Sequence, residues 1–529
     1  MNKDSLNTLF AHTQTPRWIL TLGALLAIAY LYVIAFWFPP SNLYLFAALM
    51  LGQVFLIWQI LTYIHTVWYT GKTFPRDDTY TPPVDVFITV AGEPVDVVEA
   101  TARAAQQMNY PRFQVYLLND GYVAGKDNWQ EIEELAARLG IQCITRTVPG
   151  GAKAGNINHA LQMTPGRLVA IFDADHVPHA DFLRKTVGYF SDQRVGFVQT
   201  PQYYKNKGVN YIAQSAWEQQ ELFFGPICKG KNNYNAATMC GTNMVIRREA
   251  IMQVGGMCEE SIAEDFVTGL FMHEKGWRSI YVPEVLAEGL APEDYLTYSK
   301  QQHRWARGAL DVIFRYNLFF RRGLSVSQKI QYLSSVSHFL SGVIILMNAM
   351  FPVVFLFSGE QPFQVSTMAL AAVFLPYMFI TLYILIRSSN GSFTFNALAF
   401  SMGGFAIHIT ALFHAATGAK SSFSVTSKKA LTGNFLNLVV PHMVYVGVVI
   451  VGIFVAIARD GLSPAVANNI AWALISCAVF IPAIAAAAPK RKTAAVLEAV
   501  PVFDAPQEPS EPEATIFVSH SKMRVQSSA

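Results

Sequence analysis

Six long apolar segments without a charged residue divide the chain. Each is long enough to cross the roughly 30 Å hydrocarbon core of a membrane as a helix. The first is too long for a removable signal peptide and lacks a small-residue cleavage site, so it is read as an anchor. The pattern predicts a multi-pass membrane protein with spans at residues 19–38, 43–69, 330–357, 367–386, 436–458 and 465–488.

A seventh apolar segment, Phe393–Gly418, allows two interpretations. It is apolar enough to be a span, but a span here would place the basic segment that follows it outside the cell. Thr410, His414 and Thr417 recur at i, i+4 and i+7, which is typical of an amphipathic helix lying in the membrane interface. We favour the interfacial helix.

Residues 71–329 alternate strand-like and helix-like patterns. Strands are predicted at residues 84–90, 115–118, 141–145 and 168–172, and helices at residues 95–107 and 129–139. This rhythm predicts an α/β domain with a parallel sheet. Polar residues follow the strands, at the edge where such sheets bind ligands: Gly92-Glu93, Asn119-Asp120-Gly121 and Asp173–Asp175.

Charge and composition set the orientation and exclude some functions. Lys and Arg gather near the N-terminus, between residues 387 and 429, and at residues 490–492, so these parts and the α/β domain are predicted to be cytoplasmic. The net charge of +3 on 529 residues comes without a basic stripe, which excludes nucleic-acid binding. The five cysteines are scattered without a CxxC pair, which argues against a disulfide framework or a zinc site.

Asp173 and Asp175 follow an apolar strand two residues apart. Carboxylates in this position are suited to Mg²⁺ or Mn²⁺, which a diphosphate leaving group requires, although an Asp-x-Asp turn alone is commonly only a solvated turn. The loop Gly150–Asn158 carries one lysine, Lys153, but lacks the GK[ST] ending of an ATP-binding loop. Asp265 opens a helical pattern, where acids are also favoured by the helix dipole.

A fourth polar group stands just before the third span. Gln301-Gln302-His303-Arg304-Trp305 lies on an amphipathic segment, where arginine and tryptophan are commonly interfacial anchors. No single motif among these is specific. Their order is specific: LNDG, GAKAGN, FDADH, AED and QQHRW on an α/β domain flanked by spans, followed by Phe423-Ser424-Val425-Thr426-Ser427-Lys428.

This ordered set resembles the processive family 2 glycosyltransferases, particularly the bacterial cellulose synthase catalytic subunit and its curdlan and mixed-linkage glucan synthase relatives. The resemblance covers Leu43 to about Ala488. It implies an α/β GT-A fold with a mixed, mostly parallel sheet, inserted in a helical bundle of about six spans with interfacial helices. It also implies a UDP-sugar donor. The implied layout is a cytoplasmic N-terminus 1–18, spans 19–70, a GT-A domain 71–297, interfacial helices 298–329, spans 330–488 with a gating loop 419–432, and a disordered tail 489–529.

The resemblance also implies roles for individual residues. Asp265 would be the general base that takes the acceptor proton. The donor would be bound by Asp120 at the uridine, Lys153 and Arg304 at the diphosphate, and by Asp173, Thr89 and Glu93; Mg²⁺ or Mn²⁺ would be held by Asp173 and Asp175. The acceptor would meet Trp305, Gln301, Cys240 and Gly241, and the gating loop would close through Phe423, Val425, Thr426 and Lys428.

Three motifs depart from the family. The paired acids of DDG become Asn119-Asp120, TED becomes Ala263-Glu264-Asp265, and the FFCGS acceptor motif becomes Thr238-Met239-Cys240-Gly241-Thr242. The last change puts the sugar and the linkage in doubt. The tail is too short for the cyclic-di-GMP-binding domain that relatives often carry, so no such control is expected in this chain.

The expected function is therefore polymerisation of a sugar, most simply glucose, from a UDP-sugar into a β-1,4, β-1,3 or mixed β-glucan that crosses the bacterial inner membrane. A polymer of β-linked N-acetylglucosamine or a hyaluronan-like polymer is the first alternative. A non-processive transferase acting on a lipid phosphate is the second, and a transporter with a regulatory domain is the third. A growing polysaccharide, the lipid bilayer and a periplasmic accessory subunit are the expected partners.

Overall fold

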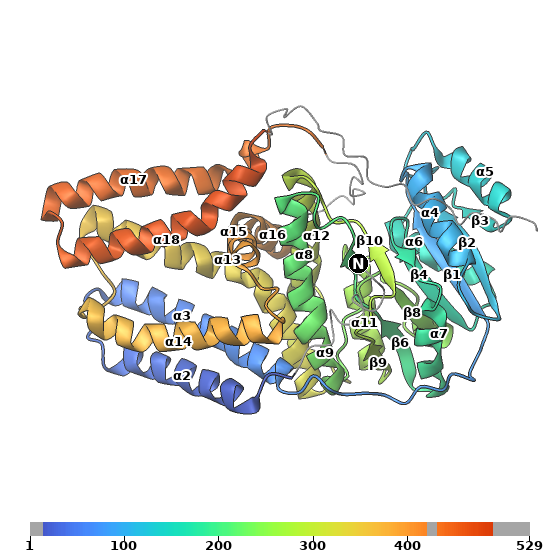
Figure 1. Cartoon of the computed structure of the whole chain (residues 1–529), viewed down its shortest axis with the longest axis horizontal. Coiled ribbons are helices and arrows are strands. Elements are labelled where there is room, and N and C mark those ends of the chain that lie inside the picture. Colours follow the sequence, from blue (N-terminus) through green and yellow to red (C-terminus); the bar gives the residue numbers. More distant parts are fainter. Residues whose placement is uncertain (1–13, 420–430, 490–529) are drawn as a thin grey trace, which may run out of the picture. The chain divides into compact units, whose positions relative to one another are not determined.

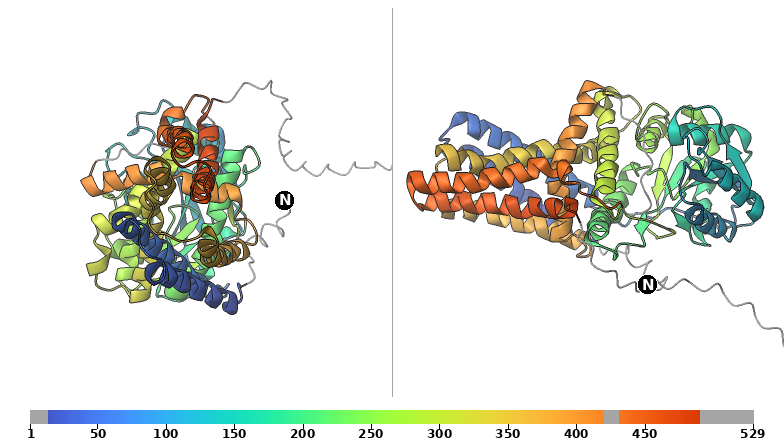
Figure 2. Two further views of the ribbon diagram at one scale, coloured as in Figure 1. Left: turned by 90° about the vertical axis from the view of Figure 1, so that its left-hand side faces the viewer. Right: turned by 90° about the horizontal axis from the view of Figure 1, so that it is seen from above.

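The computed structural model describes residues 14–419 and 431–489. The six predicted spans are all long helices that lie side by side (Figure 1 and Figure 2). They are α2 Arg17–Phe36, α3 Leu43–Val67, α13 Val326–Ser358, α14 Thr367–Ser388, α17 Val440–Asp460 and α18 Pro464–Ala487. Several begin at a side-chain cap, as at Asn42 of α3 and Ser325 of α13, which accept hydrogen bonds from the first free backbone N–H groups.

The segment 393–418 adds a seventh helical segment that is long and apolar enough to cross a membrane, Phe395–Thr417. It is divided at Gly404 into α15 Phe395–Gly403 and α16 Phe405–Thr417. At 1.5 Å per residue, the 13 residues of α16 reach only about 20 Å, so neither piece alone crosses the hydrocarbon core. The sequence predicted six spans, whereas seven helical segments of the described residues are long and apolar enough to be spans. The interfacial position of the segment 393–418 stays a prediction.

The α/β domain is built on a mixed seven-stranded sheet with the order β3-β2-β1-β4-β8-β6-β9. The strands β1 to β4 run parallel, and only β8 runs antiparallel to its two neighbours. Their bounds are β1 Val84–Val90, β2 Phe113–Asn119, β3 Gln142–Thr145, β4 Leu168–Asp173, β6 Val195–Gln199, β8 Met244–Arg247 and β9 Arg278–Tyr281. A small second sheet joins β5 Val177–Pro178, β10 Ala287–Gly289 and β7 Tyr203–Tyr204.

Both faces of the large sheet are covered by helices, which explains why its strands are apolar on both sides. Along β1, Phe87 packs into one core with α6 and α8, while Val86 and Ile88 pack into the other with α4, α5 and α7. The helices of the domain are α4 Val95–Gln106, α5 Trp129–Leu139, α6 Ala152–Met163, α7 Phe182–Thr186, α8 Tyr211–Leu222, α9 Cys228–Lys231, α10 Arg248–Gln253, α11 Glu264–Glu274 and α12 Tyr295–Phe314.

Four helices of the domain are joined to the helices of the bundle by side-chain hydrogen bonds. In α11, His273 Nδ1 lies 2.7 Å from the Tyr332 hydroxyl of α13. In α9, Lys231 Nζ donates to Ser335 Oγ of α13 at 2.6 Å. In α8, Gln219 Nε2 donates to Ser401 Oγ of α15 at 3.1 Å. In α12, His303 Nε2 lies 3.1 Å from His414 Nδ1 of α16. These contacts are polar and specific, so the α/β domain and the bundle are linked at defined positions.

Candidate active site

The carboxyl ends of β1, β2 and β4 bring three predicted donor-site residues to one edge of the sheet. Thr89 lies opposite Asp173 in the parallel pairing, and Val90 lies opposite Asn119, the residue before Asp120. Thr89 Oγ1 donates to Asp173 Oδ1 at 3.3 Å. The parallel register, which the sequence rhythm predicted, therefore places these groups together.

Lys153 is the centre of the site. It stands in the first turn of α6, after a loop in which Gly150 and Gly151 take positive φ angles of 141° and 63°. Its Nζ forms an ion pair with Asp173 and donates to Gly241 O at 2.8 Å. Burial lowers the pKa of Lys153, but the neighbouring carboxylates, with Asp173 first, outweigh burial and leave the pKa above its usual value. The lysine is therefore held charged between the DxD strand and the loop Thr238–Thr242.

Asp265 faces the same point from the other side. It lies at the start of α11, where its Oδ1 accepts from the N–H of Phe266 at 2.7 Å. Burial raises the pKa of Asp265, and the charge of Lys153 opposes the rise. Burial, together with the charge of Asp265, also raises the pKa of Glu264, to about 7. Two half-buried acids with raised pKa values beside a fixed cation are a common arrangement for general base chemistry.

Gly241 separates Lys153 from Asp265. Its φ is +75°, and a Cβ at this position would lie 2.7 Å from Asp265 Oδ2. The loop is held from behind by Gln199, whose Oε1 accepts from Cys240 N at 2.9 Å and whose Nε2 donates to Thr242 O at 2.8 Å. Gln199 carries no motif signal, and only its place at the end of β6 could have suggested its role.

His176 lies beside Asp173 and Asp175. It is the last residue of the FDADH motif, but no role was predicted for it. One ligand atom from each of Asp173, Asp175 and His176 falls within 4.8 Å of the others. Asp175 is 2% exposed. Neither ring nitrogen of the buried His176 has a hydrogen-bond partner among the described residues, and Nδ1 lies 3.4 Å from Asp175 Oδ1. Two carboxylates and an imidazole with an unsatisfied nitrogen fit a divalent cation.

Asp120 is buried and forms a two-point ion pair that was not predicted. Arg146 donates from Nε to Oδ1 at 2.8 Å and from Nη2 to Oδ2 at 2.7 Å. The same guanidinium donates to Gly150 O and Ala152 O, so it ties the end of β2 to the glycine-rich loop. Arg146 directly follows β3, and its position at the next strand end is the signal that could have identified it.

Asn119 replaces an acid of the family motif. In this chain its side chain bonds to the backbone on both sides of the turn that follows β2. Its Nδ2 donates to Trp129 O at 2.8 Å, and its Oδ1 accepts from Gly121 N at 3.0 Å. Glu93 remains at the end of β1, where its Oε2 accepts from Ala91 N at 2.6 Å.

The QQHRW residues lie on α12, beside the turn that carries Asp265. Gly308 of α12 packs directly against Ala263, with no room for a side chain between them. The charge of Arg304 opposes the rise in the pKa of both Glu264 and Asp265 that burial causes. Gln301 bonds to the hydroxyl of the buried Tyr204, and Trp305 is half-buried.

The predicted gating-loop residues Phe423, Val425, Thr426 and Lys428 lie outside the described residues. They stay predictions, as does the tail from residue 490. The five cysteines are free, in agreement with the sequence analysis.

Two family models match the chain. Residues 82–308 match "Glycosyltransferase like family 2", and residues 252–483 match "Cellulose synthase". The chain is 30% identical over 499 residues to a cellulose synthase catalytic subunit (UDP-forming) of Komagataeibacter sucrofermentans, covering 87% of this chain and 64% of that protein. It is 31% identical over 470 residues to a putative cellulose synthase 2 of Komagataeibacter xylinus, covering 84% of this chain and 30% of that protein. The chain thus spans less than two thirds of the length of these relatives.

Among solved structures, a mannosyltransferase from Pyrobaculum calidifontis in complex with GDP-Man and Mn²⁺ aligns with 71% of this chain and all of its own. Its TM-score is 0.52 at 18% sequence identity, so it supports the GT-A fold alone. The matched family regions include every described residue of the site from Thr89 to Trp305. Residues 82–308 therefore carry a family 2 glycosyltransferase domain, and residues 252–483, which overlap it, match the cellulose synthase family model.

Proposed function

We propose that this protein is a membrane-embedded, processive, inverting glycosyltransferase. It transfers glucose from UDP-glucose to the end of a growing β-glucan and moves the product across the membrane. One observation carries the proposal: Lys153 joins the Asp173 carboxylate to the Gly241 carbonyl, directly beside Asp265. Three motifs far apart in the sequence thereby form one charged site. The UDP-forming relatives support the choice of nucleotide.

Each charged group has a separate part in the transfer. The Asp265 carboxylate takes the proton of the acceptor hydroxyl while that oxygen bonds to the anomeric carbon. The bond from that carbon to the diphosphate breaks at the same time, and Lys153 and Arg304 stabilise the negative charge of the departing UDP. A single displacement inverts the carbon, so an α-linked donor yields a β-linkage. The half-buried Trp305 offers a flat apolar surface for the acceptor sugar.

A divalent cation, Mg²⁺ or Mn²⁺, would be held by Asp173 and Asp175, with His176 beside them. When bound, it would neutralise the diphosphate and so assist its departure. Asp120 and Arg146 would orient the uridine.

The loop Thr238–Thr242, here called the acceptor loop, is linked to the bundle, and this link supports translocation. Lys231 Nζ donates to Thr238 Oγ1 of the acceptor loop at 3.0 Å and to Ser335 Oγ of α13 at 2.6 Å. A chain that grows at this loop is therefore next to the membrane helices from the moment it forms. We infer that the bundle lies in the inner membrane with the catalytic domain and both termini in the cytoplasm, and that a periplasmic accessory subunit receives the product.

The direct test is sugar incorporation by the purified protein in nanodiscs. Labelled UDP-glucose and UDP-N-acetylglucosamine are supplied separately with Mg²⁺ or Mn²⁺, and the product is digested with linkage-specific glucanases. We expect an EDTA-sensitive glucan that is absent from Asp265→Asn. Asp181→Asn, which removes an acid in the loop before α7, is a matched control and should leave the rate within twofold.

The alternatives give different products. Polymer from UDP-N-acetylglucosamine alone would keep the mechanism and replace the sugar. Transfer of one sugar to a lipid phosphate would contradict processive synthesis, and equal incorporation by Asp265→Asn would contradict the assigned base.

A further inference from the structure

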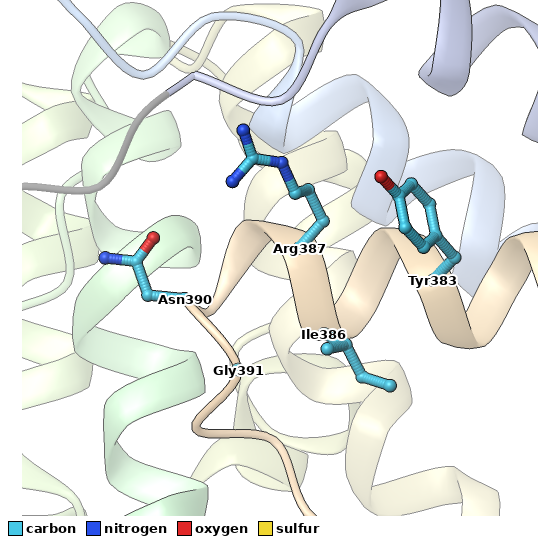
Figure 3. Close-up of a pocket in the computed structure, with 5 residues that line it drawn as sticks. All are labelled: Tyr383, Ile386, Arg387, Asn390 and Gly391. Atoms are coloured by element: carbon cyan, nitrogen blue, oxygen red, sulfur yellow. The ribbon is translucent and has the colours of Figure 1, made fainter.

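A cavity of about 290 Å³ lies at the end of α14 (Figure 3). It is lined by Tyr383, Ile386, Arg387, Asn390 and Gly391. The chain leaves α14 at Ser388 and reaches Thr394, whose hydroxyl donates to Glu218 of α8 in the catalytic domain. The cavity is therefore at the end of the bundle that the catalytic domain contacts.

Three polar side chains of the cavity point to the same side (Figure 3). Tyr383 and Arg387 are one turn apart on α14, and Asn390 follows in the turn after the helix. Within residues 14–419 and 431–489, no hydrogen bond or ion pair joins the Arg387 side chain to another residue. A guanidinium at the end of a membrane span is favourable when it faces an anionic group.

An apolar stripe leads along α14 to this arginine. Leu375, Phe379, Tyr383 and Ile386 are 40%, 61%, 48% and 44% exposed. Their spacing of four, four and three residues places them on one face of the helix. Since α14 is one of the candidate spans and only 11% of its apolar window is buried by protein, bilayer lipid covers this face. An acyl chain that lies along the stripe brings its headgroup to Arg387.

The backbone holds the cavity residues in place. Asn390 and Gly391 take positive φ angles of 52° and 79°, and Gly391 N donates to Ile386 O at 2.8 Å. Ser389 Oγ donates to Leu385 O at 2.8 Å, which closes the end of the helix. Because the turn is fixed by its own hydrogen bonds, a ligand does not have to order it on binding.

We propose that this cavity binds the phosphate headgroup of an anionic phospholipid from the leaflet nearest to the catalytic domain. The planar guanidinium of Arg387 matches two phosphate oxygens, and the Tyr383 hydroxyl and the Asn390 amide donate further hydrogen bonds. One acyl chain lies along Leu375 and Phe379. The site is separate from the transfer chemistry and does not depend on it.

The test is lipid retention measured by native mass spectrometry. The full chain is purified in mixed micelles with equal phosphatidylcholine and phosphatidylglycerol, and the ratio of retained lipids is compared between variants. We expect Arg387→Gln to lower the retained phosphatidylglycerol about fivefold, the effect of one cation near an anionic membrane surface. Arg387→Lys, which keeps the charge but loses the planar fork, should fall between the two.

The matched control is Arg459→Gln. Arg459 also stands in the last turn of a candidate span, but it is already paired with Asp460, so its loss should leave lipid retention unchanged. Inorganic phosphate is added as a soluble competitor. Unchanged retention in Arg387→Gln, or displacement of the lipid by millimolar phosphate, would overturn the proposal.

Discussion

At position 241 the backbone selects glycine for two separate reasons. The φ of +75° disfavours any side chain, and a Cβ would lie 2.7 Å from the carboxylate of Asp265. Gly255 has a similar φ of +89° but no atom within 4 Å of its Cβ position. Substitutions at Gly241 and Gly255 therefore distinguish the effect of backbone strain from the effect of crowding Asp265, the proposed base.

We predict that Gly241→Ala lowers the initial rate of polymer synthesis more than about tenfold, because the new methyl group displaces Asp265. Gly255→Ala should leave the rate within twofold. Both variants should lose a similar stability, on the order of 1 kcal/mol, because both place alanine at a positive φ. Rates and melting temperatures of the two purified variants check this, and equal rate losses would show that strain alone is responsible.

The raised pKa of Asp265 predicts a stability effect with a definite sign. Burial makes the folded chain bind this proton more tightly than the unfolded chain does. The resulting stabilisation is present below the unfolded-state pKa, near 3.9, and is lost as the pH rises through the folded-state pKa. At neutral pH the ionised Asp265 carboxylate therefore destabilises the folded chain.

Asp265→Asn should accordingly melt at a higher temperature than wild type at pH 7.5, while its activity is lost. The difference should shrink as the pH is lowered toward 4. Melting temperatures at a fixed scan rate in the same nanodiscs provide the measurement, and a lower melting temperature for Asp265→Asn at pH 7.5 would contradict it.

At the scale of elements, α12 joins the catalytic turn to the membrane helices. One side packs on Ala263 through Gly308, and another is bonded to α16 through His303 and His414 at 3.1 Å. His303 directly precedes Arg304 and Trp305, and α16 ends at Thr417, just before the predicted gating loop. The histidine pair therefore fixes the position of α12, which carries Arg304, relative to α16, which leads to the predicted gating loop.

Loss of the hydrogen bond between His303 and His414 should affect turnover more than donor binding. We predict that His303→Leu lowers kcat about fivefold, the value of one lost hydrogen bond, with little change in the KM for UDP-glucose. His303→Gln, whose Nε2 can still donate to His414, should recover most of the rate. Steady-state kinetics of the two variants test this, and equal losses in both would leave the hydrogen bond without a role.

Local patterns predicted the first half of the sheet well, because each strand and helix there is followed by its neighbour in space. The strand Val84–Val90 and the helix Trp129–Leu139 have the predicted bounds. The strands β6, β8 and β9 were not predicted, since β8 inserts antiparallel between strands distant in sequence. Gln199 and Arg146 were missed for the same reason: their roles come from partners that only the fold brings near.

At the scale of the whole molecule, hydropathy alone located the membrane helices, because a bilayer requires long apolar segments. It did not settle the segment 395–417, which meets the criteria for a span and is broken at Gly404. The motif order identified the family before the geometry was known. It did not reveal that His176 completes a group of possible metal ligands, because a histidine beside two acids gives no sign in the sequence of where its ring lies.

Repeated transfer of sugars to the same chain by one site can be measured directly. The quantity is the size of the labelled product when UDP-glucose is in large excess over the enzyme and little donor has been consumed. We predict high-mass glucan from the earliest time points, formed by wild type and absent from Asp265→Asn. Short products that lengthen only as donor is consumed, or a single sugar on lipid, would contradict it.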